Sequence, residues 1–269
     1  MTHILPRGFG HAMTQSVAAV VFLPGVVMPC ALRYAALLAE LGDEVQAILK
    51  DLELYAGATT PPDNYDISTE VEGITRTADA AGLERFHLYG HSGGGAISLA
   101  YVAAHPDRVL SLALDEPAYD FLDSTETRGY WSEIDAAGRL PERDRMPAFL
   151  KLQLGPNVAL PPAPAGTPPP WMASRPAGVL ALITALKQHH VDPSSYRRYA
   201  APVYFSHGSL SHPYWLGMRD RLATLFPDFT AERYDGRHHL NTSHQAEPAR
   251  VAQELRRHWN RALADQRSS

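Results

Sequence analysis

Three consecutive glycines separate a short apolar segment from a longer one in the stretch "RFHLYGHSGGGAISLAYVAAH", residues 85–105. The first segment has the length and apolar character of a buried strand, and the second is typical of a helix. A glycine inside a helix costs roughly 1 kcal/mol relative to alanine, so Gly93, Gly94 and Gly95 need a local reason. Two are available: a loop that binds a phosphate, or a sharp turn that exposes the hydroxyl of Ser92.

The spacing of these glycines disfavours phosphate binding. In a dinucleotide-binding turn of the form G-x-G-x-x-G, Ser92 would occupy the place of the second glycine, and the Lys-Ser/Thr pair of a P-loop is missing from the sequence here. The form G-x-S-x-G fits instead, as residues 90–94, because small residues stand two positions before and after the serine. The sequence therefore predicts that Ser92 is an exposed nucleophile, and it predicts no nucleotide cofactor.

The rest of the chain alternates between strand and helix patterns. Strands are predicted over residues 17–23, 44–49, 85–89, 108–114, 202–208 and 229–234. Helices are predicted over residues 30–41, 66–83, 94–105, 214–226 and 248–263, the second of them capped by Asp66 or Ser68. Such alternation predicts the α/β fold class, with a mostly parallel sheet flanked by helices.

The alternation stops between about residues 117 and 200. This interruption contains "GPNVALPPAPAGTPPP", residues 155–170, whose prolines lack the N–H that a helix interior or a central strand requires. We expect residues 1–117 and 201–269 to form one core. We expect residues 118–200, which are Pro-rich over 155–176, to be an insertion into that core. With 269 residues, 45% of them hydrophobic, the chain is long enough to bury one large core.

Charge and composition narrow the class of partner. The net charge is −5 and no long basic run occurs, which disfavours nucleic acid and anionic membrane surfaces. The apolar run over residues 16–28 is too short to span a membrane, and we expect no secretory signal before it. The single cysteine, Cys30, excludes a disulfide within the monomer and fits a reducing compartment. We therefore expect a cytoplasmic protein, a monomer or homodimer, whose partner is a small molecule.

The sequence also predicts no metal site. Histidine is common, with 13 copies, so position must decide which copies matter. His189 and His190 are adjacent, whereas two metal ligands on one helix face are usually four positions apart.

The turn at residues 90–94, the segment "FLPG" (residues 22–25) and "HPDRVLSLAL" (residues 105–114) together resemble the α/β-hydrolase family over nearly the whole chain. The resemblance implies a mostly parallel sheet with a nucleophile, an acid and a histidine in that chain order. It also implies a cap inserted after the strand that follows the nucleophile helix, which is where residues 118–200 lie. One departure is Pro24-Gly25, which stands where the family usually has His-Gly.

A serine hydroxyl is a poor nucleophile until a base removes its proton as it attacks. The resemblance places that base between the last strand and the last helix, in "YDGRHHLNTSHQAEP", residues 234–248. His238, His239 and His244 compete there. We favour His239, because Leu240 follows it and family loops of this kind place an apolar residue after the base. His238 is the main alternative.

The carboxylate that should orient the histidine is missing from its commonest position in the family. The loop after the fifth strand reads "SHGSLSHPYW", residues 206–215, and contains neither Asp nor Glu. The family offers a second position, at the end of the strand after the nucleophile helix, where Asp115 and Glu116 lie. We favour Glu116, because the chain from Ser92 to it is long enough for one helix, a turn and one strand to return to the same sheet edge. Asp115 is the alternative.

Acyl transfer also needs two backbone N–H groups that bind the negative oxygen of the intermediate. We expect one at Gly93, directly after the nucleophile, and the resemblance places the other at Val26, with Val27 as the alternative. These residues predict a serine hydrolase that cleaves a small, largely apolar carboxylic ester or lactone through an acyl-serine. A C–C bond hydrolase, a thioesterase or a lyase remains open on the same residues, as does a ligand-binding protein without catalysis.

Overall fold

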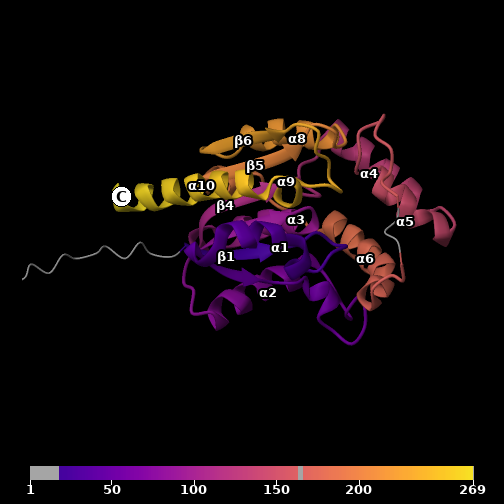
Figure 1. Ribbon diagram of the computed structural model, residues 1–269, viewed down its shortest axis with the longest axis horizontal. Helices are drawn as coiled ribbons and strands as arrows, with labels where there is room; N and C mark the ends of the chain where they lie inside the picture. The colour runs from indigo at the N-terminus through magenta and orange to yellow at the C-terminus, as the bar shows by residue number, and fades with distance from the viewer. Residues whose placement is uncertain (1–17, 163–165, 269) are drawn as a thin grey trace, which may run out of the picture.

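The protein, described by a computed structural model over residues 18–162 and 166–268, is built around a six-stranded parallel sheet (Figure 1). The strand order is β2-β1-β3-β4-β5-β6. The strands are β1 (Ala18–Leu23), β2 (Val45–Leu49), β3 (Phe86–His91), β4 (Val109–Asp115), β5 (Val203–Gly208) and β6 (Phe229–Tyr234). The predicted α/β class is confirmed. The first predicted strand residue, position 17, and the segment expected to lack a secretory signal lie outside the described residues.

Helices flank the sheet in the order that the alternating pattern predicts, except that the short helix α9 lies in a segment predicted to be a loop. The core helices are α1 (Cys30–Leu41), α2 (Ile67–Ala80), α3 (Gly93–Ala104), α8 (Tyr214–Ala223), α9 (Ser243–Ala246) and α10 (Pro248–Ser268). Short 3₁₀ turns are η1 (Gly42–Glu44), η2 (Glu53–Tyr55), η3 (Pro106–Arg108) and η4 (Pro170–Ser174). Of the two predicted caps of α2, Asp66 is the one observed: its carboxylate accepts a hydrogen bond from the N–H of Thr69 at 2.8 Å. No described helix is both long and apolar enough to cross a bilayer.

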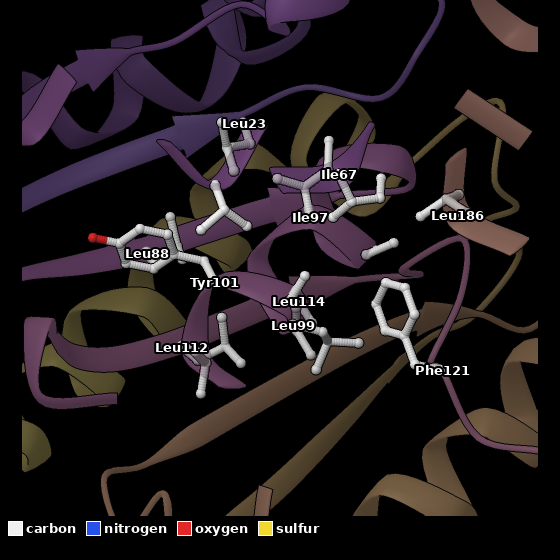
Figure 2. Close-up of a cluster of buried hydrophobic side chains, with 14 of the residues drawn as sticks. Leu23, Ile67, Leu88, Ile97, Leu99, Tyr101, Leu112, Leu114, Phe121 and Leu186 are labelled. Carbon is white, nitrogen blue, oxygen red and sulfur yellow. The ribbon is translucent and has the colours of Figure 1, made fainter. Parts of the chain in front are cut away.

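The two faces of the sheet bury different sets of side chains, because successive residues of a strand point to opposite faces. On β3, Tyr89 packs in the cluster that includes α1 and α10, and Leu88 packs in the cluster that includes α2 and α3. Figure 2 shows the second cluster, in which Leu88 and Leu99 lie with Leu186 from the insertion. This second core therefore joins the sheet to the inserted segment.

The inserted segment contains four helices that the sequence analysis did not predict: α4 (Thr125–Gly138), α5 (Glu142–Lys151), α6 (Arg175–Gln188) and α7 (Ser194–Arg198). Helix α5 has Pro147 in its interior and α6 is apolar over much of its surface, so a simple amphipathic pattern is weak in both. Helix α4 buries Tyr130, Trp131 and Ile134 at helical spacing, a pattern that the sequence analysis did not use. In Figure 1, α4, α5 and α6 lie beyond the end of the sheet to which the strand arrows point. That edge also carries the end of β3 and therefore Ser92.

Candidate active site

Ser92 occupies a sharp turn between β3 and α3. Its φ of 53° is in the left-handed region that non-glycine residues rarely adopt, and such strained residues cluster at functional sites. The glycines after it allow close packing: a Cβ at Gly94 would lie 2.5 Å from the carbonyl oxygen of Pro24, and a Cβ at Gly95 would lie 2.9 Å from the Cα of Pro117. The glycine run is therefore explained by close approach of neighbouring backbone at a turn that presents a hydroxyl.

Three side chains predicted from the sequence form one chain of hydrogen bonds. The Ser92 Oγ lies 2.9 Å from Nε2 of His239, and Nδ1 of His239 lies 2.8 Å from Oε2 of Glu116. All three residues are buried. With the Nδ1–H donated to the carboxylate, Nε2 is left as the acceptor for the serine hydroxyl. This is the arrangement that a general base needs.

Glu116 reaches His239 because the chain turns sharply at the end of β4. The φ of Glu116 is 46°, which is again in the left-handed region. Its backbone N–H donates to the carbonyl oxygen of Ser206 at 3.1 Å, and its Oε1 accepts the N–H of Gly208 at 2.7 Å. The end of β5 thus supplies hydrogen-bond partners that hold the acid from β4.

Backbone hydrogen bonds also tie the nucleophile turn to the acid turn. The N–H of Ser92 donates to the carbonyl oxygen of Asp115 at 3.1 Å, and the N–H of Ala118 donates to the carbonyl oxygen of Ser92 at 2.8 Å. These two bonds hold the nucleophile turn against the turn that carries Glu116.

Trp215 holds the ring of His239 in a way that the sequence analysis did not foresee. The two rings are stacked, with centroids 4.3 Å apart and an interplanar angle of 14°. The indole Nε1–H donates to the carbonyl oxygen of Pro117 at 3.0 Å, which fixes the stacking partner itself. His91 also lies near, with its ring centroid 4.8 Å from that of His239. A tryptophan next to a loop carries no sequence signal that separates this contact from ordinary packing.

The amides of Gly93 and Val26 lie close together. Gly93 is the first residue of α3, so its N–H has no acceptor within the helix. A Cβ at Gly93 would lie 3.6 Å from the backbone nitrogen of Val26. Val26 is buried, and its carbonyl oxygen accepts the hydroxyl of Tyr55 at 2.7 Å, which fixes this loop. The arrangement suits two donors that bind one oxygen.

The alternative base and acid make other bonds. Nδ1 of His238 accepts the N–H groups of Leu240 and Asn241 at 3.2 and 3.1 Å, so His238 shapes the turn that carries His239. The carboxylate of Asp115 lies 2.7 Å from Nδ1 of His244, the third candidate base. The geometry therefore joins Ser92 to His239 and Glu116, and it assigns the competing histidines and Asp115 to other contacts.

Asp115, His91 and His244 form a buried cluster of groups that can bind metal ions, with the ligand atoms all within 4.8 Å of one another. The 2.7 Å between Asp115 Oδ2 and His244 Nδ1 is a hydrogen-bond distance, whereas two ligands of one tetrahedral zinc ion lie about 3.4 Å apart. The cluster thus fits a hydrogen-bonded network better than a metal centre. The other Asp115 oxygen accepts the hydroxyl of Ser206 at 2.8 Å.

The electrostatics of this network agree with hydrogen bonding. Burial, the largest single influence, raises the pKa of Asp115, but the hydrogen bonds and charge interactions with His244 and His91 together outweigh it and hold that pKa well below its usual range. Burial lowers the pKa of both His244 and His91, so both imidazoles are neutral near pH 7. Asp115 is therefore a buried carboxylate stabilised by its hydrogen bonds to His244 and Ser206.

A small cavity of about 30 Å³ adjoins Ser92. Its walls combine Gly93 and Val26 of the core with residues of α4 and α6, among them Tyr130 and Leu182. Leu182 lies so close that a Cβ at Gly93 would be 2.6 Å from its Cδ2. The inserted helices therefore pack directly over the nucleophile.

A parallel sheet with a serine at the turn between β3 and α3 and a histidine after the last strand defines a class of protein. The chain belongs to the alpha/beta hydrolase fold family, whose family model matches residues 18–244. This match confirms the resemblance to the α/β-hydrolase family that the sequence analysis inferred from the turn at residues 90–94.

Individual relatives match smaller parts of the sequence or only the fold. A fluoroacetate dehalogenase from Burkholderia sp is 35% identical over 101 residues, which is 34% of this chain and 33% of that protein. A putative carbamate hydrolase RutD from Caulobacter sp. (strain K31) is 39% identical over 57 residues, 21% of each chain. The matched segment thus spans only about a third of the length of the dehalogenase.

Among solved structures, a thermophilic esterase from Thermogutta terrifontis superposes with a TM-score of 0.67 at 16% identity, covering 91% of this chain and 90% of that one. At this identity the likeness establishes the shared fold and leaves the substrate open.

Proposed function

We propose that this protein is a serine hydrolase that cleaves a small, largely apolar carboxylic ester or lactone through an acyl-serine intermediate. The observation that carries the proposal is the hydrogen-bonded chain from Ser92 through His239 to Glu116. In this role Ser92 is the nucleophile, His239 the general base and acid, and Glu116 the group that orients the imidazole and stabilises its protonated form.

The reaction proceeds in two balanced steps. Ser92 Oγ attacks the ester carbonyl as His239 Nε2 takes its proton, the N–H groups of Gly93 and Val26 bind the negative oxygen, and the alcohol leaves with the proton from His239. A water molecule then attacks the acyl-serine as His239 takes a proton from it, and the acid leaves as Ser92 regains its hydrogen. The net consumption is one water per ester, and these steps use only groups of the chain.

The serine nucleophile favours ester hydrolysis over dehalogenation, the activity in the name of the Burkholderia relative. Displacement of a halide from carbon by a serine would leave an ether, which water does not readily cleave, so turnover would stop after one event. Attack of Ser92 on a carbonyl leaves an ester, which water does cleave. Ser92 thus favours acyl transfer, and a carbamate carbonyl, as in the name of the Caulobacter relative, belongs to the same chemistry.

The test is a panel of p-nitrophenyl esters, lactones and a carbamate, assayed on the wild type and on Ser92→Ala. We expect hydrolysis of at least one ester or lactone, and a loss of at least about 10⁴-fold in kcat in the variant. A wild type that binds these compounds without releasing product would instead support the ligand-binding alternative. Activity that persists in Ser92→Ala would overturn the assignment of the nucleophile.

A further inference from the structure

A second and larger cavity lies within the inserted segment, between α4, α5 and α6. Its volume is about 280 Å³, close to the lower end of the range for small-molecule sites. Its lining is apolar apart from Glu142 and Arg145. We call it the outer cavity, and the 30 Å³ space beside Ser92 the inner cavity.

The two cavities share a wall. Four residues line both of them: Ile134, Phe149, Val179 and Ile183. Side chains of these four therefore lie between the outer cavity and the space beside Ser92. Rotamer changes of these side chains, of which Ile134 and Val179 are buried, would have to open this wall for an apolar chain to pass.

The position of the inner cavity identifies which side of an ester it receives. The departing alcohol must lie at Nε2 of His239, which gives it a proton, and the carbonyl oxygen must lie at the N–H groups of Gly93 and Val26. The inner cavity is lined by Ser92, Gly93 and Val26 and not by His239. It therefore lies on the side of the acyl substituent.

We propose that the outer cavity binds the distal part of the substrate's acyl group, which extends from Ser92 through the shared wall. This inference rests on the proposed function. At about 30 Å³ the inner cavity has room for only about two water molecules, so an acyl group beyond a few atoms needs the space behind the wall. The substrate class is accordingly an ester of an uncharged, apolar acid with a chain or ring of medium length.

Helix α4 offers a matched pair of positions for the test. Gly138 lines the outer cavity and Gly129 does not, and a Cβ at either would have nothing within 4 Å. Gly138→Leu thus adds a side chain at the lining of the outer cavity, and Gly129→Leu adds the same side chain to the same helix away from that lining. Both positions are exposed. Both sites are open, so both variants should fold, which circular dichroism and thermal melting will verify.

The measurement is kcat/KM for p-nitrophenyl esters from acetate to octanoate. For the wild type we expect a rise of about fourfold per methylene, which is the value of burying one CH₂ group, over the length that fits. Gly138→Leu should lose at least tenfold on octanoate and change by less than twofold on acetate, and Gly129→Leu should match the wild type on both. Identical chain-length profiles for the two variants would overturn the proposal.

A second pair of variants guards against a misfolded Gly138→Leu. Leu180 lines the outer cavity and is 57% exposed, and Leu216 on α8 is 44% exposed and lies outside the cavity lining. Leu180→Glu should again reduce octanoate hydrolysis selectively, and Leu216→Glu should not. If Leu180→Glu leaves the chain-length profile unchanged and converts a dimer to a monomer, the outer cavity is an interface between copies and the proposal is wrong.

Failure of this inference is distinguishable from failure of the proposed function. A wild type that hydrolyses acetate but shows no gain with chain length contradicts the acyl site alone. A wild type inactive on every ester, with Ser92 unreactive toward an organophosphorus probe, contradicts the proposed function itself.

Discussion

Asp115 and Glu116 are consecutive in the chain, yet their carboxylates bind different histidines. Glu116 Oε2 lies 2.8 Å from Nδ1 of His239, and Asp115 Oδ2 lies 2.7 Å from Nδ1 of His244. The left-handed backbone of Glu116, with φ 46°, turns the two side chains apart at the end of β4. Only the Glu116 pair continues to Ser92, so the two carboxylates should differ in what their removal does.

Glu116→Gln should lower kcat by about 10³- to 10⁴-fold with little change in KM. The amide retains the acceptor for the N–H of Gly208 but no longer stabilises the protonated ring of His239 or fixes its tautomer. Steady-state kinetics on the best ester of the panel, with a melting curve to verify folding, provide the measurement. An active Glu116→Gln would remove this residue from the catalytic assignment.

Asp115→Asn should reduce stability more than it reduces kcat, which is the opposite of Glu116→Gln. Because Asp115 is a buried carboxylate that accepts hydrogen bonds from His244 and Ser206, its neutral replacement should lower the free energy of unfolding by about 2 kcal/mol. We expect kcat to fall by less than about tenfold. A folded but inactive Asp115→Asn beside an active Glu116→Gln would reverse the two roles.

Gly94→Ala should destabilise the fold strongly, by about 3 kcal/mol or more. Its Cβ would lie 2.5 to 2.6 Å from the carbonyl oxygens of Pro24 and Leu23, which are backbone atoms that cannot rotate away. Gly129→Ala is the matched control, because that position on α4 is open and alanine is the better helix former. Urea denaturation of the two variants gives the comparison, and equal midpoints would contradict the close packing.

Stability should fall as the pH drops from 6.5 to 4. Burial lowers the pKa of His87 to about 4 and that of His258 to about 3, below the ordinary value of 6.5. Over this interval the unfolded chain binds protons that the folded chain does not, so acid favours unfolding. For His87 alone the effect is roughly 3 kcal/mol by pH 4.

His87→Gln isolates this contribution. Glutamine keeps a polar atom near Ser111, which contacts His87 Nδ1 at 2.8 Å, but does not titrate. The free energy of unfolding of His87→Gln should therefore depend less steeply on pH than that of the wild type. The control variant His190→Gln, at an exposed position, should keep the pH dependence of the wild type. Parallel curves for all three proteins would show that His87 is not a buried neutral imidazole.

Trp215→Leu should lower kcat by about tenfold and leave KM nearly unchanged, because the indole stacks on His239 and positions it without contacting Ser92. Trp215→Phe keeps an aromatic face and should recover part of the loss. If the leucine variant raises KM alone, Trp215 is a substrate contact instead of a positioning residue.

The strands, the core helices and the three hydrogen-bonded residues follow from the sequence, because each depends on a local pattern. The turn at Ser92 needs small neighbours, which the sequence shows directly. Because the loop after the fifth predicted strand has no acid, Glu116 at the end of β4 becomes the favoured carboxylate. The choice of His239 over His238 rests on one following apolar residue, and the hydrogen bonds of the two histidines agree with it.

Features that depend on distant parts of the chain were not predictable in this way. Among the described helices of the insertion, α5 has a proline in its interior and α6 is apolar on most sides, so neither shows a clean amphipathic period. The stacking of Trp215 on His239 and the packing of Leu182 against Gly93 arise only when the insertion and the loop after β5 meet at the end of β3.

The measurement that tests the account most directly is covalent labelling with a fluorophosphonate, followed by intact-mass analysis and peptide mapping. The account predicts one adduct per chain, on Ser92, absent in Ser92→Ala and strongly slowed in His239→Ala. A wild-type protein that is folded but unlabelled, or that carries its adduct on another residue, would contradict the claim that Ser92 is the activated nucleophile.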